Sequence, residues 1–293
     1  MTAPPPTGLR DDGTLAREGD PRLIPRAFLP PVEALRTGLP RVFGDRMHSA
    51  YLYGSIPRGT ATPHTSDLDA LVLLHTPPTP TDHDRARVLM NDLDAAFPVI
   101  DGGAILLDHT GQVLRPLTAQ DGGFFVSCLC TPLIGPDLAT RLPAYRPTTL
   151  LARQTNGDLH LVLPRWRQAL ERARTDADLT ALARRVGRRL VRTGFTLIMP
   201  TWGGWTSDLS LATDLFAHHH PAQATVMRRA LAAAEHPTPD PDLLRSLLDR
   251  PALWLEATYT RTHGRRTSPR TVRPAPAARD RPPWDAHRPG FPV

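Results

Sequence analysis

Residues 51–74 read YLYGSIPRGTATPHTSDLDALVLL, and this stretch decides how the fold is interpreted. An apolar segment ends at Gly54, a polar loop follows, and Asp67 and Asp69 then alternate with the apolar residues of a second segment. On a strand these two carboxylates share one face, about 6–7 Å apart, where they would repel each other if left bare. Mg²⁺ relieves this repulsion, because it is usually held by one or two carboxylates together with substrate phosphates. The alternation therefore predicts a metal site suited to phosphoryl transfer.

The Gly-Ser turn ahead of the loop predicts an anion site next to these carboxylates. Gly54 lets the backbone approach a phosphate closely, and Ser55 adds a hydroxyl donor. Arg58 follows three residues later, and a guanidinium can clamp a phosphate through two parallel hydrogen bonds. Either element alone is a weak signal, but a Gly-Ser turn and an Asp-x-Asp pair between two apolar segments form a specific combination.

This combination resembles the nucleotidyltransferase superfamily that includes DNA polymerase beta, whose shared pattern is a hydrophobic-Gly-Gly/Ser turn, a spacer, and Asp-x-Asp. The resemblance implies that Gly54, Ser55, Arg58 and Ser66 bind the nucleotide. It also implies that Asp67 and the second aspartate of the pair hold two Mg²⁺ ions. The donor substrate implied is an NTP, with ATP as the first candidate.

A third carboxylate on a neighbouring strand completes the site in that superfamily. The expected strand lies in residues 97–111, which read FPVIDGGAILLDHTG. Asp101 and Asp108 have opposite parity, so only one of them can face the metals if the strand is regular. We prefer Asp101 as the third catalytic and metal-binding residue, with Asp108 as the alternative. If Asp101 and the two following glycines only form a turn, two carboxylates remain.

The chain is helical from about residue 150, and one stretch resembles the aminoglycoside 3″/9 adenylyltransferases. Within residues 192–221, an arginine, an aromatic-Thr-Leu, a Gly turn and a serine keep that family's order, but Asp208 stands where it has lysine. The resemblance implies a helical domain that closes over the nucleotide, and a small hydroxylated acceptor such as an aminoglycoside-like antibiotic. Trp202 and Trp205 flank the glycines and are open to two interpretations, stacking on a ligand or packing against helices.

We therefore expect an α+β protein whose N-terminal nucleotidyltransferase domain, a small mixed sheet flanked by helices, precedes an all-α helical-bundle domain. The expected strands cover residues 49–54, 67–74, 98–108 and 124–130, with a helix over 82–96 capped by Thr81. Further helices are expected near 158–173, 208–220, 222–235 and 241–262. The expected domains are a flexible arm (1–20), the catalytic domain (21–145), the helical substrate or lid domain (146–263) and a disordered Pro/Arg-rich tail (264–293).

Charge, cysteines and the chain's start limit the partners and the compartment. The tail holds seven arginines and two aspartates, so only about +1 of the net charge of +6 belongs to the other residues. This body lacks a basic stripe, and we expect no nucleic-acid partner. Cys128 and Cys130 are two apart with no second pair, which favours core thiols in a reducing cytosol. Neither a signal peptide nor a membrane span is expected, so we predict a cytoplasmic protein.

Three functions remain open at this point. The first is a Mg²⁺-dependent nucleotidyltransferase that modifies a small hydroxylated molecule. The second is a minimal nucleotidyltransferase that modifies a protein partner, as in toxin-antitoxin pairs. The third is a catalytically degenerate nucleotide-binding module, which an incomplete set of carboxylates would favour.

Overall fold

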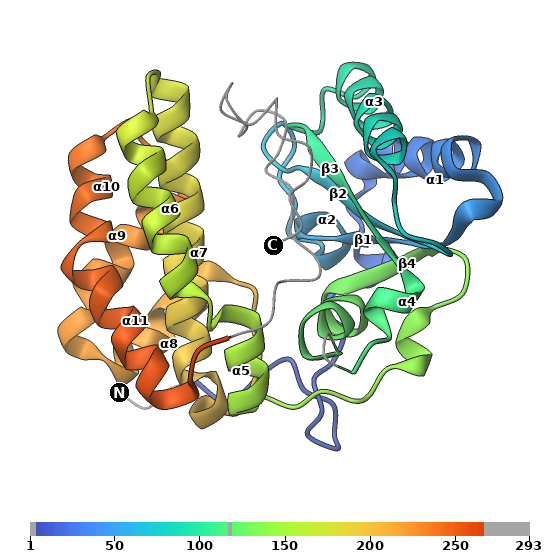
Figure 1. Ribbon diagram of the computed structural model, residues 1–293. Coiled ribbons are helices and arrows are strands. Elements are labelled where there is room, and N and C mark those ends of the chain that lie inside the picture. Colours follow the sequence, from blue (N-terminus) through green and yellow to red (C-terminus); the bar gives the residue numbers. More distant parts are fainter. Residues whose placement is uncertain (1–3, 117–118, 267–293) are drawn as a thin grey trace. The chain divides into compact units, whose positions relative to one another are not determined.

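The computed structural model describes residues 4–116 and 119–266, which divide into two compact units (Figure 1). The sheet unit comprises residues 16–144 and the helical unit comprises residues 4–15 and 145–266. Within the described ranges, no helix has both the length and the apolar character needed to cross a bilayer. The predicted mixed sheet followed by helices is confirmed, whereas the predicted domain limits stay predictions.

The sheet unit contains one four-stranded mixed sheet of order β3-β2-β1-β4. β1 is antiparallel to both β2 and β4, while β2 and β3 are parallel and joined through helix α3. The strands are β1 (Met47–Tyr53), β2 (Leu68–Leu74), β3 (Gly103–His109) and β4 (Cys130–Ile134).

Two of the predicted strands need correction. The strand expected over 98–108 begins only at Gly103, because residues 101–102 form an irregular approach to it. The strand expected over 124–130 is wrong, since residues 125–129 form a π-helical turn and β4 starts at Cys130. Both cysteines are buried thiols outside any disulfide among the described residues, as the interpretation as core thiols predicted.

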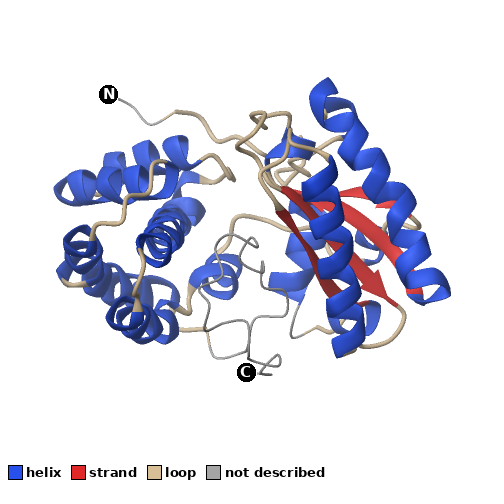
Figure 2. Ribbon diagram, turned by 90° about the horizontal axis from the view of Figure 1, so that it is seen from above, coloured by secondary structure: helices blue, strands red, loops and turns tan. Residues whose placement is uncertain are grey.

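Two helices cover one face of this sheet, and shorter elements cover the other (Figure 2). Apolar residues of α1 and α3 pack on Ala50, Leu52 and the even-numbered positions of β2. Val113, Val126 and Leu138 pack on the opposite face, which carries Tyr51, Tyr53, Leu71 and Leu73. The helical elements are η1 (Pro21–Leu23), η2 (Arg26–Phe28), α1 (Leu29–Phe43), η3 (Gly44–Arg46), α2 (Ser55–Arg58), α3 (Pro80–Ala96), α4 (Thr110–Val113), η4 (Ala119–Gly123), η5 (Phe125–Leu129) and η6 (Leu138–Arg141).

The helical unit is built around α7, a helix of 27 residues that contacts each of the other α-helices of this unit. A Cβ at Gly187 would collide with the Ala230 carbonyl, so this glycine lets α7 and α9 approach closely. The elements are α5 (Thr149–Asn156), α6 (Leu159–Arg172), α7 (Asp176–Trp202), α8 (Leu209–His219), η7 (Pro221–Gln223), α9 (Ala224–Glu235), α10 (Pro241–Leu248) and α11 (Arg250–His263).

The two ends of the described chain have defined contacts in the helical unit. Trp202 Nε1 donates to the Pro4 carbonyl (2.9 Å), the Trp205 N–H donates to the Thr7 carbonyl (2.9 Å), and the Leu15 N–H donates to the Tyr145 carbonyl (2.8 Å). Residues 4–15 of the predicted flexible arm therefore pack on this unit. The predicted disordered tail lies outside the described residues from 267 onwards.

Candidate active site

Strand pairing brings the Gly-Ser turn and the two aspartates to the same edge of the sheet. Tyr53, the last residue of β1, pairs with Asp69, so Gly54 follows directly beside that carboxylate. Gly54 has φ of 87°, a left-handed conformation that favours glycine, and it precedes α2. A Cβ built on Gly54 would lie 3.6 Å from Asp69 Oδ2. The predicted anion turn and the predicted metal ligand are thus neighbours in space.

The residues around Asp69 form a row across one face of the sheet. Asp69 pairs with Ala104 on β3 and with Tyr53 on β1, and Tyr53 in turn pairs with Cys130 on β4. The Tyr53 ring packs edge-to-face on Phe125 with centroids 5.1 Å apart, within the apolar cluster that covers this face of the sheet. Sequence reasoning missed Tyr53, although its place directly before Gly54 was the available signal.

The two aspartates suit a magnesium ion that also binds substrate phosphates. Asp67 lies immediately before β2 and Asp69 within it, and both residues are half-buried. Across the described ranges, no group of three or more His, Cys, Asp and Glu side chains is arranged to hold a metal ion. Two carboxylates leave most coordination positions to nucleotide and water, which is the usual mode for Mg²⁺. These two residues therefore fit the ion, but they do not provide a complete set of protein ligands for it.

Asp101 lies at this edge of the sheet, in the approach to β3. Its N–H donates to the Ser66 carbonyl (3.1 Å), and the Leu68 N–H donates to the Gly102 carbonyl (3.0 Å). Its backbone is therefore tied to the residues that flank Asp67. However, β3 position 104, which lies directly opposite Asp69, is an alanine. Whether Asp101 acts as a third metal ligand stays a prediction.

Asp108, the alternative third carboxylate, lies further along β3. It pairs with Leu73, four residues beyond Asp69 on β2 and therefore about 13 Å away along the strand. Its side chain is buried and its Oδ1 accepts the His109 N–H (2.8 Å), while no described group donates to Oδ2. Burial raises the pKa of Asp108 to about 6, although the His109 hydrogen bond opposes this shift. This distance makes Asp108 unsuitable as a partner of Asp69.

Two of the predicted nucleotide-binding side chains make contacts within the protein. Arg58 Nε donates to the Gly54 carbonyl (3.0 Å), so the guanidinium braces the Gly-Ser turn from within α2. Ser66 Oγ accepts the Thr62 N–H (2.9 Å) and closes the loop that leads into the aspartates. Both residues thus shape the edge of the sheet, and their contact with a nucleotide stays a prediction.

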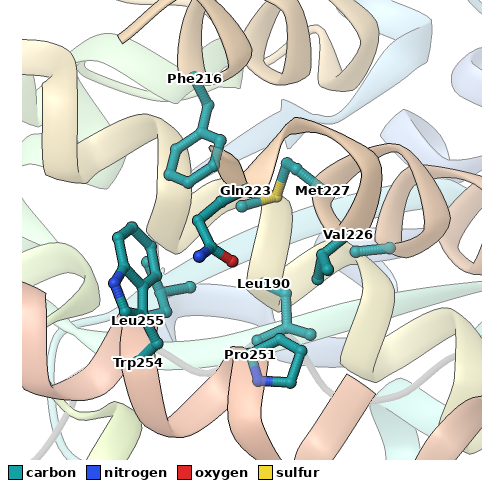
Figure 3. Close-up of a pocket in the computed structure, with 9 residues that line it drawn as sticks. Leu190, Phe216, Gln223, Val226, Met227, Pro251, Trp254 and Leu255 are labelled. Carbon is teal, nitrogen blue, oxygen red and sulfur yellow. The ribbon is translucent and has the colours of Figure 1, made fainter. Parts of the chain in front are cut away.

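In the helical unit, the structure decides between the two interpretations of the tryptophans. Trp202 and Trp205 are buried, and both pack edge-to-face on Phe195. They are core residues, so stacking on a ligand is not their role. A small, mainly apolar pocket lies elsewhere in this unit (Figure 3), lined by Leu190, Phe216, Gln223, Val226, Met227, Ala230, Pro251, Trp254 and Leu255. None of the predicted site residues lines it.

Comparison with protein families finds one match within the sheet unit. Residues 35–96 match the family model described as "Nucleotidyltransferase domain", a segment that runs from α1 to the end of α3 and contains both halves of the motif. The predicted likeness to the nucleotidyltransferase superfamily is confirmed for this segment. The match supports a transferase of nucleotidyl groups.

Solved structures give a more distant comparison. The chain is similar to spectinomycin adenyltransferase AAD(9) from Enterococcus faecialis, solved with ATP and spectinomycin, at 13% sequence identity and a TM-score of 0.47. The similarity covers 79% of this chain and 98% of that chain. No curated protein matches the sequence.

Proposed function

We propose that this protein transfers a nucleoside monophosphate from an NTP, with ATP as the donor, to a hydroxyl group of a small molecule. The observation that carries the proposal is the pairing of Tyr53 with Asp69, which sets the Gly54-Ser55 turn beside one of the two carboxylates proposed to hold the metal. A triphosphate with its Mg²⁺ fits this combination of hydrogen-bond donors and carboxylates. An aminoglycoside-like antibiotic is the first acceptor class to test.

The residues at the edge of the sheet have distinct roles in this proposal. Asp67 and Asp69 would hold Mg²⁺, with Asp101 as a third ligand, and Ser55 would donate to the triphosphate. When bound, the ion would neutralise the phosphates and stabilise the leaving pyrophosphate. Gly54 would allow the close approach of the phosphates, because it has no side chain and its φ of 87° favours glycine.

The experiment is a transfer assay with α-labelled NTPs, Mg²⁺ and a panel of aminoglycosides, candidate protein partners and RNA. Label in an aminoglycoside or another small molecule supports the proposal, whereas label in protein would favour a protein-modifying enzyme. We expect Asp67→Asn and Asp69→Asn each to lower the rate by at least about 100-fold, because either change removes a charge that the metal requires. The exposed Asp92→Asn on α3 is the matched control and should retain the wild-type rate.

A specific observation favours one alternative, a module that binds nucleotide without transferring it. Ala104 occupies the β3 position beside Asp69, so the row lacks a carboxylate on that strand. The same assay decides between the two functions. NTP binding without label transfer to any acceptor in the panel would point to the binding module, and near-normal rates in Asp69→Asn would contradict the site assignment.

A further inference from the structure

Residues 16–20 of the sheet unit, here called the N-terminal strap, pack against α2, the helix that begins at Ser55. The Glu18 N–H donates to the Cys128 carbonyl (2.9 Å), and the Asp20 N–H donates to the Pro57 carbonyl in α2 (2.9 Å). A Cβ on Gly19 would collide with Thr131, so the strap fits closely between α2 and β4. Because this segment was predicted to be a loose arm, no role was assigned to it from the sequence.

A bidentate ion pair anchors the strap at its start. Arg17 Nη1 lies 2.8 Å from Asp137 Oδ2, Nη2 lies 3.1 Å from Oδ1, and Nε donates to the Ser127 carbonyl (3.2 Å). Both side chains of the pair are mostly buried, with exposed fractions of 22% and 26%. These contacts fix the position of the strap on the sheet unit.

This fixed position places one carboxylate behind the predicted phosphate turn. Glu18 Oε2 lies 3.8 Å from Arg58 Nη1, and only 14% of the Glu18 side chain is exposed. Arg58 in turn donates through Nε to the carbonyl of Gly54. The contacts therefore run in sequence from the strap to Glu18, to Arg58, to Gly54, and so to the turn beside Asp69.

We propose that Glu18 is a positioning residue, which holds the Arg58 guanidinium in the orientation that fixes the Gly54-Ser55 turn for the triphosphate. Its kinetic consequence rests on the proposed function. The turn would bind the triphosphate in the ground state and in the transition state alike. Loosening it should therefore raise the KM for NTP and leave kcat nearly unchanged.

The first test uses hydrogen exchange in the nucleotide-free protein and does not depend on the function. The Gly59 N–H donates to the Ile56 carbonyl (3.1 Å) and the Thr60 N–H donates to the Ser55 carbonyl (3.1 Å), so these two amides report on the turn. Glu18→Gln keeps the size of the side chain and removes its charge. We expect these amides to exchange about fivefold faster in this variant.

The matched control is Glu33→Gln on α1, since Glu33 also pairs with an arginine, Arg36, but is exposed and remote in sequence from the turn. It should leave exchange at Gly59 and Thr60 unchanged, and both variants should keep the wild-type melting temperature within a few degrees. Equal exchange in Glu18→Gln and the wild type would overturn the proposal. An equal increase in both variants would also overturn it, because the effect would then be general.

The second test measures the KM for NTP and kcat in the transfer assay, with the calorimetric Kd of MgATP as an arm that needs no acceptor. In Glu18→Gln we expect KM and Kd to rise about fivefold, with kcat within about twofold of the wild type. Glu18→Asp should recover part of the affinity, because it restores the charge. Faster exchange with unchanged KM and Kd would show that the turn does not hold the triphosphate and would overturn the positioning role. If the wild type binds no MgATP, the proposed function fails, while the exchange test still decides whether Glu18 braces the turn.

Discussion

At the scale of single residues, Asp108 is a carboxylate whose surroundings are poorly suited to a charge. It lies on β3 with Oδ2 buried, in the part of the sheet unit whose core is otherwise apolar. Its pKa rises from 3.8 to about 6 because burial disfavours the ionised form. A group with a raised pKa stabilises the folded state fully below pH 3.8, and this contribution is lost as the pH rises through 6.

Asp108→Asn should therefore stabilise the protein at neutral pH. We expect the free energy of unfolding to exceed that of the wild type by roughly 2–3 kcal/mol at pH 7.5, with the difference shrinking towards pH 4. Urea unfolding of both proteins at several pH values measures this. Asp84→Asn, at an exposed site on α3, is the control and should change the stability by less than about 0.5 kcal/mol at every pH. A constant difference between Asp108→Asn and the wild type would contradict the raised pKa.

At the scale of elements, the approach to β3 depends on one glycine. A Cβ on Gly103 would collide with the carbonyl of Leu68, its partner on β2, whereas a Cβ on Gly102 meets nothing within 4 Å. Both glycines have positive φ, 84° at Gly102 and 157° at Gly103, so alanine is strained at either position. Only Gly103→Ala adds the collision, which would separate β3 from β2, the strand that carries Asp69.

Gly103→Ala should thus cost more stability than Gly102→Ala. We expect a loss of more than about 2 kcal/mol in the first variant and about 1 kcal/mol in the second. Differential scanning calorimetry of the two variants and the wild type measures the difference. Equal losses of stability in the two variants would mean that the positive φ alone, and not the collision with Leu68, makes alanine unfavourable at these positions.

Helices and strands with a clear local sequence pattern could be predicted, whereas those whose local pattern is weak could not. β1 and β2 carry the apolar alternation on either side of the motif, and both were found. α1 was missed because prolines occupy its first turn, where they are tolerated, and position 40 near its end. α3 was found, but its cap is Thr79 rather than Thr81, since Asp82 completes a capping box with Thr79.

The site shows the same division. The Gly-Ser turn and the aspartates could be predicted together, because strand pairing joins residues that are close in the sequence. The position of Glu18 could not be predicted, because residues 17 and 18 are held by Ser127, Cys128 and Asp137, which lie more than a hundred residues later in the sequence. Parity could not decide between Asp101 and Asp108 without the register, which places Asp108 opposite Leu73.

At the scale of the whole molecule, the helical unit is assembled from two distant parts of the chain. Leu15, in the N-terminal part, is 1% exposed, and its N–H donates to Tyr145 at the start of the second part. The tryptophans among residues 4–116 and 119–266, which are Trp166, Trp202, Trp205 and Trp254, all belong to this unit. Tryptophan fluorescence therefore reports mainly on its folding.

Leu15→Ala should accordingly lower the stability of the helical unit by about 2–4 kcal/mol, the usual cost of truncating a buried leucine. Leu161→Ala on α6 of the same unit, at a site that is 49% exposed, is the control and should cost less than about 1 kcal/mol. Urea unfolding followed by tryptophan fluorescence compares the two variants. Similar losses would show that residues 4–15 do not contribute to this unit.

Because the helical unit is built from two distant parts of the chain, its first part is synthesised long before the residues that it packs against. Trp202 and Trp205 are made 198 residues after their respective partners Pro4 and Thr7. At about 5–20 residues per second, this delay lasts on the order of 10–40 s. Residues 16–144 of the sheet unit are complete well before then. Residues 4–15 thus wait for partners that are made much later, and chaperones or proteases in the cell have that time to act on them.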